Sequence, residues 1–144
     1  MKKILPLVVL TLSVSFSVDA QKLAASEVPA AAKTAFEKQY PSTPVKWEKE
    51  DGKFEAGFIF KKHSMSVLYS ADGTITETEI DIDIEAAEIP GEMLKYLKNN
   101  YAGMQINETA RITKADGSIN YEAEVDGKDL IFDVRGKFIK SLKN

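Results

Sequence analysis

The sequence predicts an α+β fold in which two helices cover one face of a curved antiparallel sheet. Two segments, Val28–Tyr40 and Ile89–Tyr101, each begin with an aliphatic residue and a proline and end in a tyrosine, at an offset of 61 residues. Short segments of alternating polarity, separated by Asp-Gly or Arg-Gly turns, follow each of them. Self-similarity at a fixed offset is typical of a tandem repeat. We therefore expect one unit, a helix followed by an antiparallel β-meander, to occur twice, at about residues 26–85 and 87–144.

The first twenty residues are typical of a secretory signal peptide. Lys2 and Lys3 precede an apolar run, and a cleavage-site pattern of small or apolar residues ends at Ala20. The apolar run is shorter than the about 20 residues that a membrane-spanning helix needs. We therefore predict cleavage after Ala20, a mature single domain at residues 21–144 without a membrane span, and a periplasmic or secreted location.

The composition excludes several kinds of site. The chain has no cysteine and one histidine, so it has no disulfide, no thiol nucleophile and no metal site built on cysteine or on several histidines. A formal net charge of −3 argues against a nucleic-acid partner, because phosphates require clustered lysine and arginine. No cofactor is predicted.

The two predicted helices have clear boundaries. The first runs from Pro29 to Gln39, since proline is favoured at the first helical position and Pro41 ends the helix. The second begins at Pro90 and ends before Gly103. Each carries an apolar stripe that we expect to pack on the sheet. The stripes consist of Val28, Ala32, Ala35, Phe36 and Tyr40, and of Met93, Leu94, Leu97 and Tyr101.

The predicted strands alternate apolar and polar residues, most clearly in Phe54–Phe60 and Ile119–Val125. Turns such as Ala71–Thr74, Ala115–Ser118 and Asp126–Lys128 contain a glycine, which tolerates the positive φ of a tight turn. Because short turns join antiparallel neighbours, we expect an antiparallel sheet with both helices on one face and the other face open.

The run Thr76–Glu85 alternates without a break and predicts five carboxylates on one strand face, with neighbours about 6–7 Å apart. This stripe can be a solvated face, a dock for a basic protein, or a divalent-cation site with Glu79, Asp81 and Asp83 as candidate ligands. A regular strand spreads carboxylates too widely for the 6–8 oxygens of a Ca²⁺ cage, which favours the solvated face.

No catalytic residue is predicted. His63 precedes Ser64 in a basic hairpin tip, but adjacent side chains of a strand point apart and no nucleophile elbow surrounds the serine. The many carboxylates include no pair that stands out as a glycosidase pair.

The helix that begins with proline and ends in tyrosine, the tryptophan-bearing segment Val45–Glu48 and the Asp-Gly hairpins occur behind a signal peptide. In these features residues 26–144 resemble the PepSY-like family of exported bacterial proteins, whose fold is similar to that of the beta-lactamase inhibitor protein. The resemblance implies helices on one face of a curved sheet and a free face for a partner, and PepSY domains also occur in inhibitory propeptides of peptidases. It implies no catalytic residues.

These observations predict an exported, non-enzymatic binding module that engages or inhibits a cell-envelope protein or peptide through its open sheet face. A divalent-cation-binding envelope protein and a carboxylate-based hydrolase are the alternatives. The sequence identifies neither the partner nor the oligomeric state. The candidate binding residues are Glu55, Ile59, Tyr69, Tyr121, Glu122 and Glu124.

Overall fold

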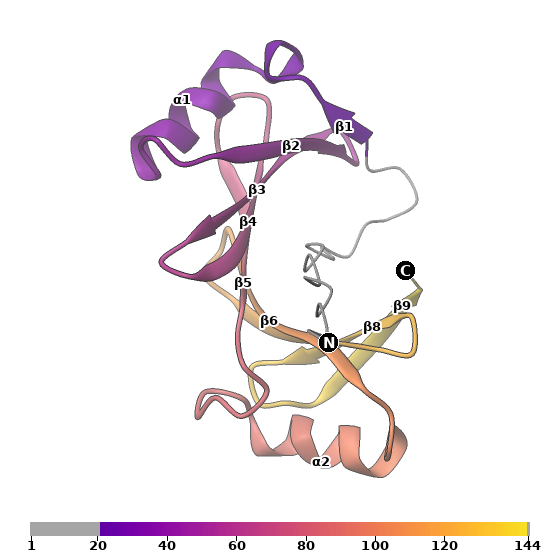
Figure 1. Ribbon diagram of the computed structural model, residues 1–144. Coiled ribbons are helices and arrows are strands. Elements are labelled where there is room, and N and C mark those ends of the chain that lie inside the picture. Colours follow the sequence, from indigo (N-terminus) through magenta and orange to yellow (C-terminus); the bar gives the residue numbers. More distant parts are fainter. Residues whose placement is uncertain (1–20, 144) are drawn as a thin grey trace, which may run out of the picture.

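In the computed structural model, residues 21–143 are described, and they form one nine-stranded antiparallel sheet with two α-helices (Figure 1). The predicted signal peptide and its cleavage site lie outside the described residues. The elements are β1 (Gln21–Leu23), a 3-10 turn (Ala25–Glu27), α1 (Ala30–Gln39), β2 (Val45–Glu50), β3 (Lys53–Phe60), β4 (His63–Tyr69), β5 (Ile75–Asp81), α2 (Gly91–Asn100), β6 (Ile106–Lys114), β7 (Ile119–Val125), β8 (Lys128–Asp133) and β9 (Phe138–Lys143).

The sheet is a meander whose spatial order follows the chain from β1 to β9, and every neighbouring pair is antiparallel. The α+β class and the antiparallel sheet are therefore confirmed. The order α1-β2-β3-β4-β5 is followed by α2-β6-β7-β8-β9. A duplicated unit as the origin of this order stays a prediction.

A proline precedes and a tyrosine follows both helices, but each helix begins one residue later than predicted. Pro29 and Pro90 are the N-cap residues and not the first helical residues, and the missing proline N–H leaves no intrahelical bond unmade. At the other ends, the N–H of Tyr40 donates to the Phe36 carbonyl and that of Tyr101 to the Leu97 carbonyl, both at 2.8 Å.

The strand register shows that both helices cover the same face of the sheet. Cross-strand partners lie on one face. One row of partners runs through Phe58, Met65, Ile80, Arg111, Tyr121 and Phe132. Phe58 belongs to the core under α1, and Tyr121 and Phe132 belong to the core under α2. Figure 1 shows the sheet curving so that the helices lie at its two ends, on the outer side.

The two cores differ from the predicted stripes at few positions. Ala32 and Phe36 of α1 and Met93 and Leu97 of α2 are buried, but Leu94 is 40% exposed because it lies beside the contact face of its helix.

Tyr69 and Tyr121 require a correction. The sequence makes them candidates for the open sheet face, but the structure places Tyr69 in the α1 core and Tyr121 in the α2 core. The reason is strand alternation, which orients Tyr69 with Val67 and Tyr121 with Ala123, both fully buried.

The predicted acidic strand is shorter than the alternating run. β5 ends at Asp81, and Asp83 begins a turn in which its backbone carbonyl and side chain accept N–H bonds from Ala86 and Glu85 at 2.9 Å. Asp83 and Glu85 therefore do not share a strand face with Glu79 and Asp81, and that part of the prediction is wrong.

Candidate functional site

The sheet face opposite the helices collects carboxylates from three consecutive strands, β5, β6 and β7. One register row joins Ser66, Glu79, Ile112 and Asn120, and the next joins Asp81, Ala110, Glu122, Ile131 and Lys140. Glu108 and Glu124 pair beside them. We call this surface the concave face, because the helices lie on the outer side of the curved sheet (Figure 1).

The concave face contains a hollow of about 170 Å³. Glu77, Glu79 and Glu122 supply acidic groups, Lys114 and Lys140 also line it, and Ile112 and Ile131 supply an apolar floor. Pockets for drug-sized ligands occupy about 300–1,000 Å³. The hollow is therefore suited to one side chain rather than to a small-molecule substrate.

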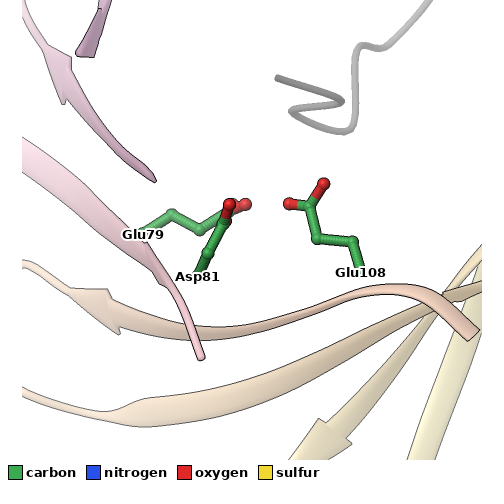
Figure 2. Close-up of side chains that lie close together, drawn as sticks. All are labelled: Glu79, Asp81 and Glu108. Atoms are coloured by element: carbon green, nitrogen blue, oxygen red, sulfur yellow. The ribbon is translucent and has the colours of Figure 1, made fainter. Parts of the chain in front are cut away.

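Three carboxylates converge at one end of this face. Glu79 and Asp81 from β5 and Glu108 from β6 each place an oxygen within 4.8 Å of the other two (Figure 2). The register explains the meeting: Asp81 pairs with Ala110, and Glu108 is two residues further along the same strand face. Carboxylate oxygens of this kind are ligands that Ca²⁺ accepts.

Of the predicted metal candidates, the structure brings Glu79 and Asp81 together and puts Glu108 in the position expected for Asp83. The sequence interpretation missed Glu108 because the residue is distant in the chain and contributes from a neighbouring strand. The sequence signal that could have found Glu108 is the alternation of the strand Ile106–Lys114, which puts Glu108, Ala110 and Ile112 on one face.

Burial and mutual repulsion keep protons on this face. Burial, followed by the nearby charges of Glu122 and Glu108, raises the pKa of Glu79 well above its usual range. Burial and the adjacent Asp81 raise the pKa of Glu108 to about 9. Burial and the charge of Glu50 raise the pKa of Glu55 to about 8. A positively charged group that binds to this face would therefore displace the protons from these carboxyl groups.

Asp81 and Glu108 interact directly. The Glu108 carboxyl lowers the pKa of Asp81, while Asp81 raises the pKa of Glu108. Oε1 of Glu108 is buried and has no hydrogen-bond partner among residues 21–143. Burial raises the pKa of Asp81 as well, although Glu108, Ser64 and His63 partly offset the rise.

The expectation of a solvated open face is wrong at its centre. Glu55 and Glu122 are each 3% exposed and Glu79 is 6% exposed, because the curved sheet crowds them together. Glu124 is half-buried and accepts a bond from Asn107 Nδ2 at 3.3 Å. Ile59, by contrast, is 66% exposed near the end of β3.

His63 lies at the rim of this surface. Its ring Nδ1 is 3.3 Å from the backbone carbonyl of Asp81, and the side chain is exposed. Ser64 is buried on the concave face next to it. Among residues 21–143, no third side chain orients the histidine toward the serine, as a nucleophilic site requires.

Comparison with known proteins identifies the architecture. The model of the family described as "Putative beta-lactamase-inhibitor-like, PepSY-like" matches residues 16–77 and again 53–140, so that together the two matches span most of the chain. No curated protein matches the sequence. None of the described helices is long and apolar enough to cross a membrane.

Solved structures share the fold at low identity. A Bacteroides eggerthii protein classed as putatively periplasmic is 14% identical with a TM-score of 0.69, over 81% of this chain and 88% of its own. A DUF2874 family protein of Bacteroides uniformis is 18% identical with a TM-score of 0.67, over 81% and 89%. A BLIP-like protein of Bacteroides fragilis is 20% identical with a TM-score of 0.62, over 80% and 86%. At these identities the likeness shows the fold alone.

Proposed function

Because the chain belongs to this beta-lactamase-inhibitor-like, PepSY-like family, we propose that it is an exported binding module, not an enzyme, that engages or inhibits a cell-envelope protein. The signal-peptide pattern supports export, and a similar fold in a protein classed as putatively periplasmic supports the periplasm as its location. The absence of an oriented nucleophile or base around His63 and Ser64 in the described chain supports a role without catalysis.

The observation that carries the proposal is the acidic hollow of the concave face. It has the size of one side chain, an apolar floor at Ile112 and Ile131, and walls on which carboxylates outnumber the two lysines, Lys114 and Lys140. A lysine or arginine side chain fits these features, since its methylene stem packs on apolar surface and its charged end forms charge-assisted hydrogen bonds with carboxylates. The partner therefore presents a cationic side chain to the hollow.

The remaining concave residues shape the docking surface. Glu55 and Glu122 add buried carboxyl groups at its centre, and Glu124 and Glu108 continue the carboxyl groups beyond the hollow. Ile59 adds an exposed apolar contact near the end of β3. Complementary charge of this kind raises the association rate and makes it dependent on salt.

We also infer that the two halves are tandem copies of one unit, each contributing half of the concave face. The repeated element order and the two overlapping matches of the same family support this.

A divalent cation is the second candidate ligand, favoured by the approach of Glu79, Asp81 and Glu108 to within 4.8 Å. These residues offer three carboxylates, whereas Ca²⁺ takes 6–8 oxygens, so such a site depends on water or on a partner for the rest. No observation favours a hydrolase over these two functions.

Capture from a cell-envelope extract tests the proposal. Residues 21–144 are immobilised in three forms: the parent, a double variant and a control. The double variant carries Glu79→Gln and Glu122→Gln, and the matched control carries Glu92→Gln on the exposed side of α2. We expect one stoichiometric protein that the parent and the control retain and the double variant loses. Equal retention by all three would refute a concave binding site.

A calcium titration separates the second candidate. If the carboxylates hold a cation, millimolar Ca²⁺ raises the melting temperature of the parent and not that of a Glu108→Gln variant. Equal melting temperatures with Ca²⁺ and with a chelator exclude it.

A further inference from the structure

A groove lies on the helix side of the sheet, between α2 and the turn that joins β8 to β9. Its volume is about 540 Å³, within the range of about 300–1,000 Å³ that ligand sites occupy. Among the side chains that line it are two aromatic rings, an amide and three cations: Tyr96, Phe138, Asn99, Lys95, Arg135 and Lys137. We call it the α2 groove. Because α2 lies on the outer side of the curved sheet, the α2 groove and the concave face are separate surfaces (Figure 1).

Two stacked aromatic rings form the base of the α2 groove. Tyr96 and Phe138 lie nearly parallel, with a centroid distance of 4.8 Å and an interplanar angle of 6°. The fully buried Phe132 contacts them edge to face, at 5.5 Å from Tyr96 and 5.9 Å from Phe138. The core under α2 therefore holds both rings in place, while each stays partly exposed. Because these rings are already ordered, binding on them costs little side-chain entropy.

Three cationic side chains surround the ring pair. Lys95 comes from α2, Arg135 and Lys137 come from the β8–β9 turn, and all three are exposed. None of them forms an ion pair among residues 21–143, although one carboxylate, that of Glu92, also lines the groove. The carboxylate of Asp133 in the same turn accepts the backbone N–H groups of Arg135 and Lys137 at 2.9 Å, and so fixes the turn that carries them. Three cations against one carboxylate in the lining favour an anionic ligand.

The first half of the chain shows that the fold itself does not require these side chains. Gly73 packs against the start of α1 as Gly136 packs against the start of α2, so the two turns occupy corresponding places. At the positions that correspond to Lys95, Tyr96, Asn99, Arg135, Lys137 and Phe138, the first half has Thr34, Ala35, Lys38, Asp72, Thr74 and Ile75. The ring pair and the excess of positive charge therefore belong to the second half alone, and they serve something other than the fold.

The shape of the α2 groove suits an extended chain. Its charged and amide side chains are all exposed, whereas a small metabolite needs an enclosed site that buries most of its surface. Arginine and lysine clusters recognise acidic segments of proteins, and an arginine can form two parallel hydrogen bonds with one carboxylate. The ring edges carry partial positive charge, and the Asn99 amide can hydrogen-bond to a peptide backbone. An acidic peptide therefore matches every part of the lining except Glu92.

Other anionic ligands match the groove less well. Its three cations are fewer than the about four to eight of a basic cluster that binds anionic lipid. Nucleic acid requires a larger basic surface, and this chain has a formal net charge of −3. A sugar that packs on an aromatic ring needs an open ring face, whereas Tyr96 and Phe138 each cover one face of the other.

We propose that the α2 groove is a second binding site of this protein, for an extended acidic segment of a partner protein. Carboxylates of the segment pair with Lys95, Arg135 and Lys137, and an apolar side chain between them packs on the ring pair. This site goes beyond the proposed function, because it lies on the other face of the sheet and takes a ligand of the opposite charge. The chain can therefore hold two partners at once.

Fluorescence anisotropy with a labelled peptide of glutamates and one central leucine tests the site on residues 21–144, at about 50 mM salt. We expect saturable binding of this peptide and none of the same peptide with glutamines in place of the glutamates. Arg135→Gln with Lys137→Gln should weaken binding at least about tenfold, because two charge-assisted contacts are lost. Lys38→Gln with Lys62→Gln is the matched control, since it removes two exposed charges elsewhere and should bind as the parent does.

Two further measurements test the ring pair and the carboxylate of the lining. A peptide with serine in place of the leucine should bind the parent more weakly, a test that leaves the protein unchanged. Glu92→Gln should bind the glutamate peptide more tightly than the parent, because it removes the repulsive charge. Equal affinity of the Arg135 and Lys137 variant and the parent, equal weakening in the matched control, or no binding by the parent at about 1 mM peptide overturns the proposal.

Failure of this site is distinguishable from failure of the proposed function. Glu79→Gln with Glu122→Gln, which is expected to lose the envelope protein in the capture experiment, should bind the glutamate peptide no more weakly than the parent. Loss of the peptide by that variant overturns the α2 groove as the site, because both substitutions lie on the concave face. Binding of polygalacturonate in preference to the peptide, dependent on Arg135 and Lys137, also overturns the proposal and assigns the groove to an acidic polysaccharide.

Discussion

The two halves of the molecule build the same architecture from different side chains. In the first, Phe36 of α1 meets the rings of Tyr40, Trp47 and Phe58 at centroid distances of 5.0–5.7 Å, so aromatic contacts dominate the core. In the second, the fully or largely buried residues of α2 are the aliphatic Met93 and Leu97, and the ring contacts lie beside them, among Tyr96, Phe132 and Phe138, at centroid distances of 4.8–5.9 Å. The same fold therefore tolerates different core side chains, provided that the volume of the core and the pattern of polar and apolar residues are kept.

What the halves share lies at the boundaries of the elements. Besides the proline starts and tyrosine ends, each helix is approached by a turn glycine of its own half. A β-carbon on Gly73 would lie 2.7 Å from the Ala31 carbonyl oxygen, and one on Gly136 would lie 2.6 Å from the Met93 nitrogen. Close backbone packing at the start of each helix, rather than a common core, is what makes the halves alike.

Core truncation gives the largest expected effect on this comparison. Phe36→Ala and Leu97→Ala should each lower the free energy of unfolding by about 2–5 kcal/mol, with Phe36→Ala the larger because it removes several ring contacts. Urea denaturation measures both losses. A loss under about 0.5 kcal/mol in either variant would mean that its helix is not docked on the sheet.

Substitution of the two shared glycines, Gly73 and Gly136, should give the second-largest loss of stability. Gly73→Ala and Gly136→Ala combine a φ of +86° or +87° with a clash against helix backbone, so each should cost more than about 2 kcal/mol. Gly117→Ala is the matched control, since its φ of +82° is similar but nothing lies within 4 Å of the added carbon. Thermal unfolding of the three variants separates strain from contact, and equal losses would contradict the close approach.

A pH dependence of stability distinguishes the concave face from both cores. The folded chain holds the Glu55 proton up to a pKa of about 8, whereas the ordinary value is 4.5. Between these values the folded state binds more protons than the unfolded state, so the free energy of unfolding falls as pH rises. Because the pKa of Glu108 is about 9, the free energy of unfolding should continue to fall up to about pH 9.

Melting temperatures measured from pH 5 to pH 9.5 should therefore decrease steadily. Glu55→Gln should flatten part of the slope by raising the melting temperature at high pH, since the glutamine stays neutral. Glu92→Gln, on an exposed helix surface, should leave the slope unchanged. A flat profile for the parent would show that the concave carboxyls are ionised at neutral pH.

The sequence predicts the fold better than it predicts the site, for a physical reason. Helix limits at Pro29 and Pro90 and the alternation of Phe54–Phe60 are local signals, and the antiparallel order follows from short turns. The convergence of Glu79, Asp81 and Glu108 depends on the pairing of β5 with β6 across an intervening helix, which no local pattern specifies. Tyr69 and Tyr121 show the same limit, because an aromatic residue fits a core and a binding surface equally well until the register is known.

The smallest expected effect concerns the ion pair of the second half. Arg111 donates to Glu88 at 2.8 Å, with both side chains 37% exposed, on the helix side of the sheet. Partly exposed pairs contribute about 0–1 kcal/mol. Glu88→Gln should therefore lower the free energy of unfolding by less than about 1 kcal/mol, and the difference should vanish at 0.5 M salt because the charges are screened. A loss of about 2 kcal/mol that persists in salt would instead mean that Arg111 depends on Glu88 to stay hydrogen-bonded beside the buried Tyr121, and that the second half, unlike the first, relies on an ion pair as well as on its ring contacts.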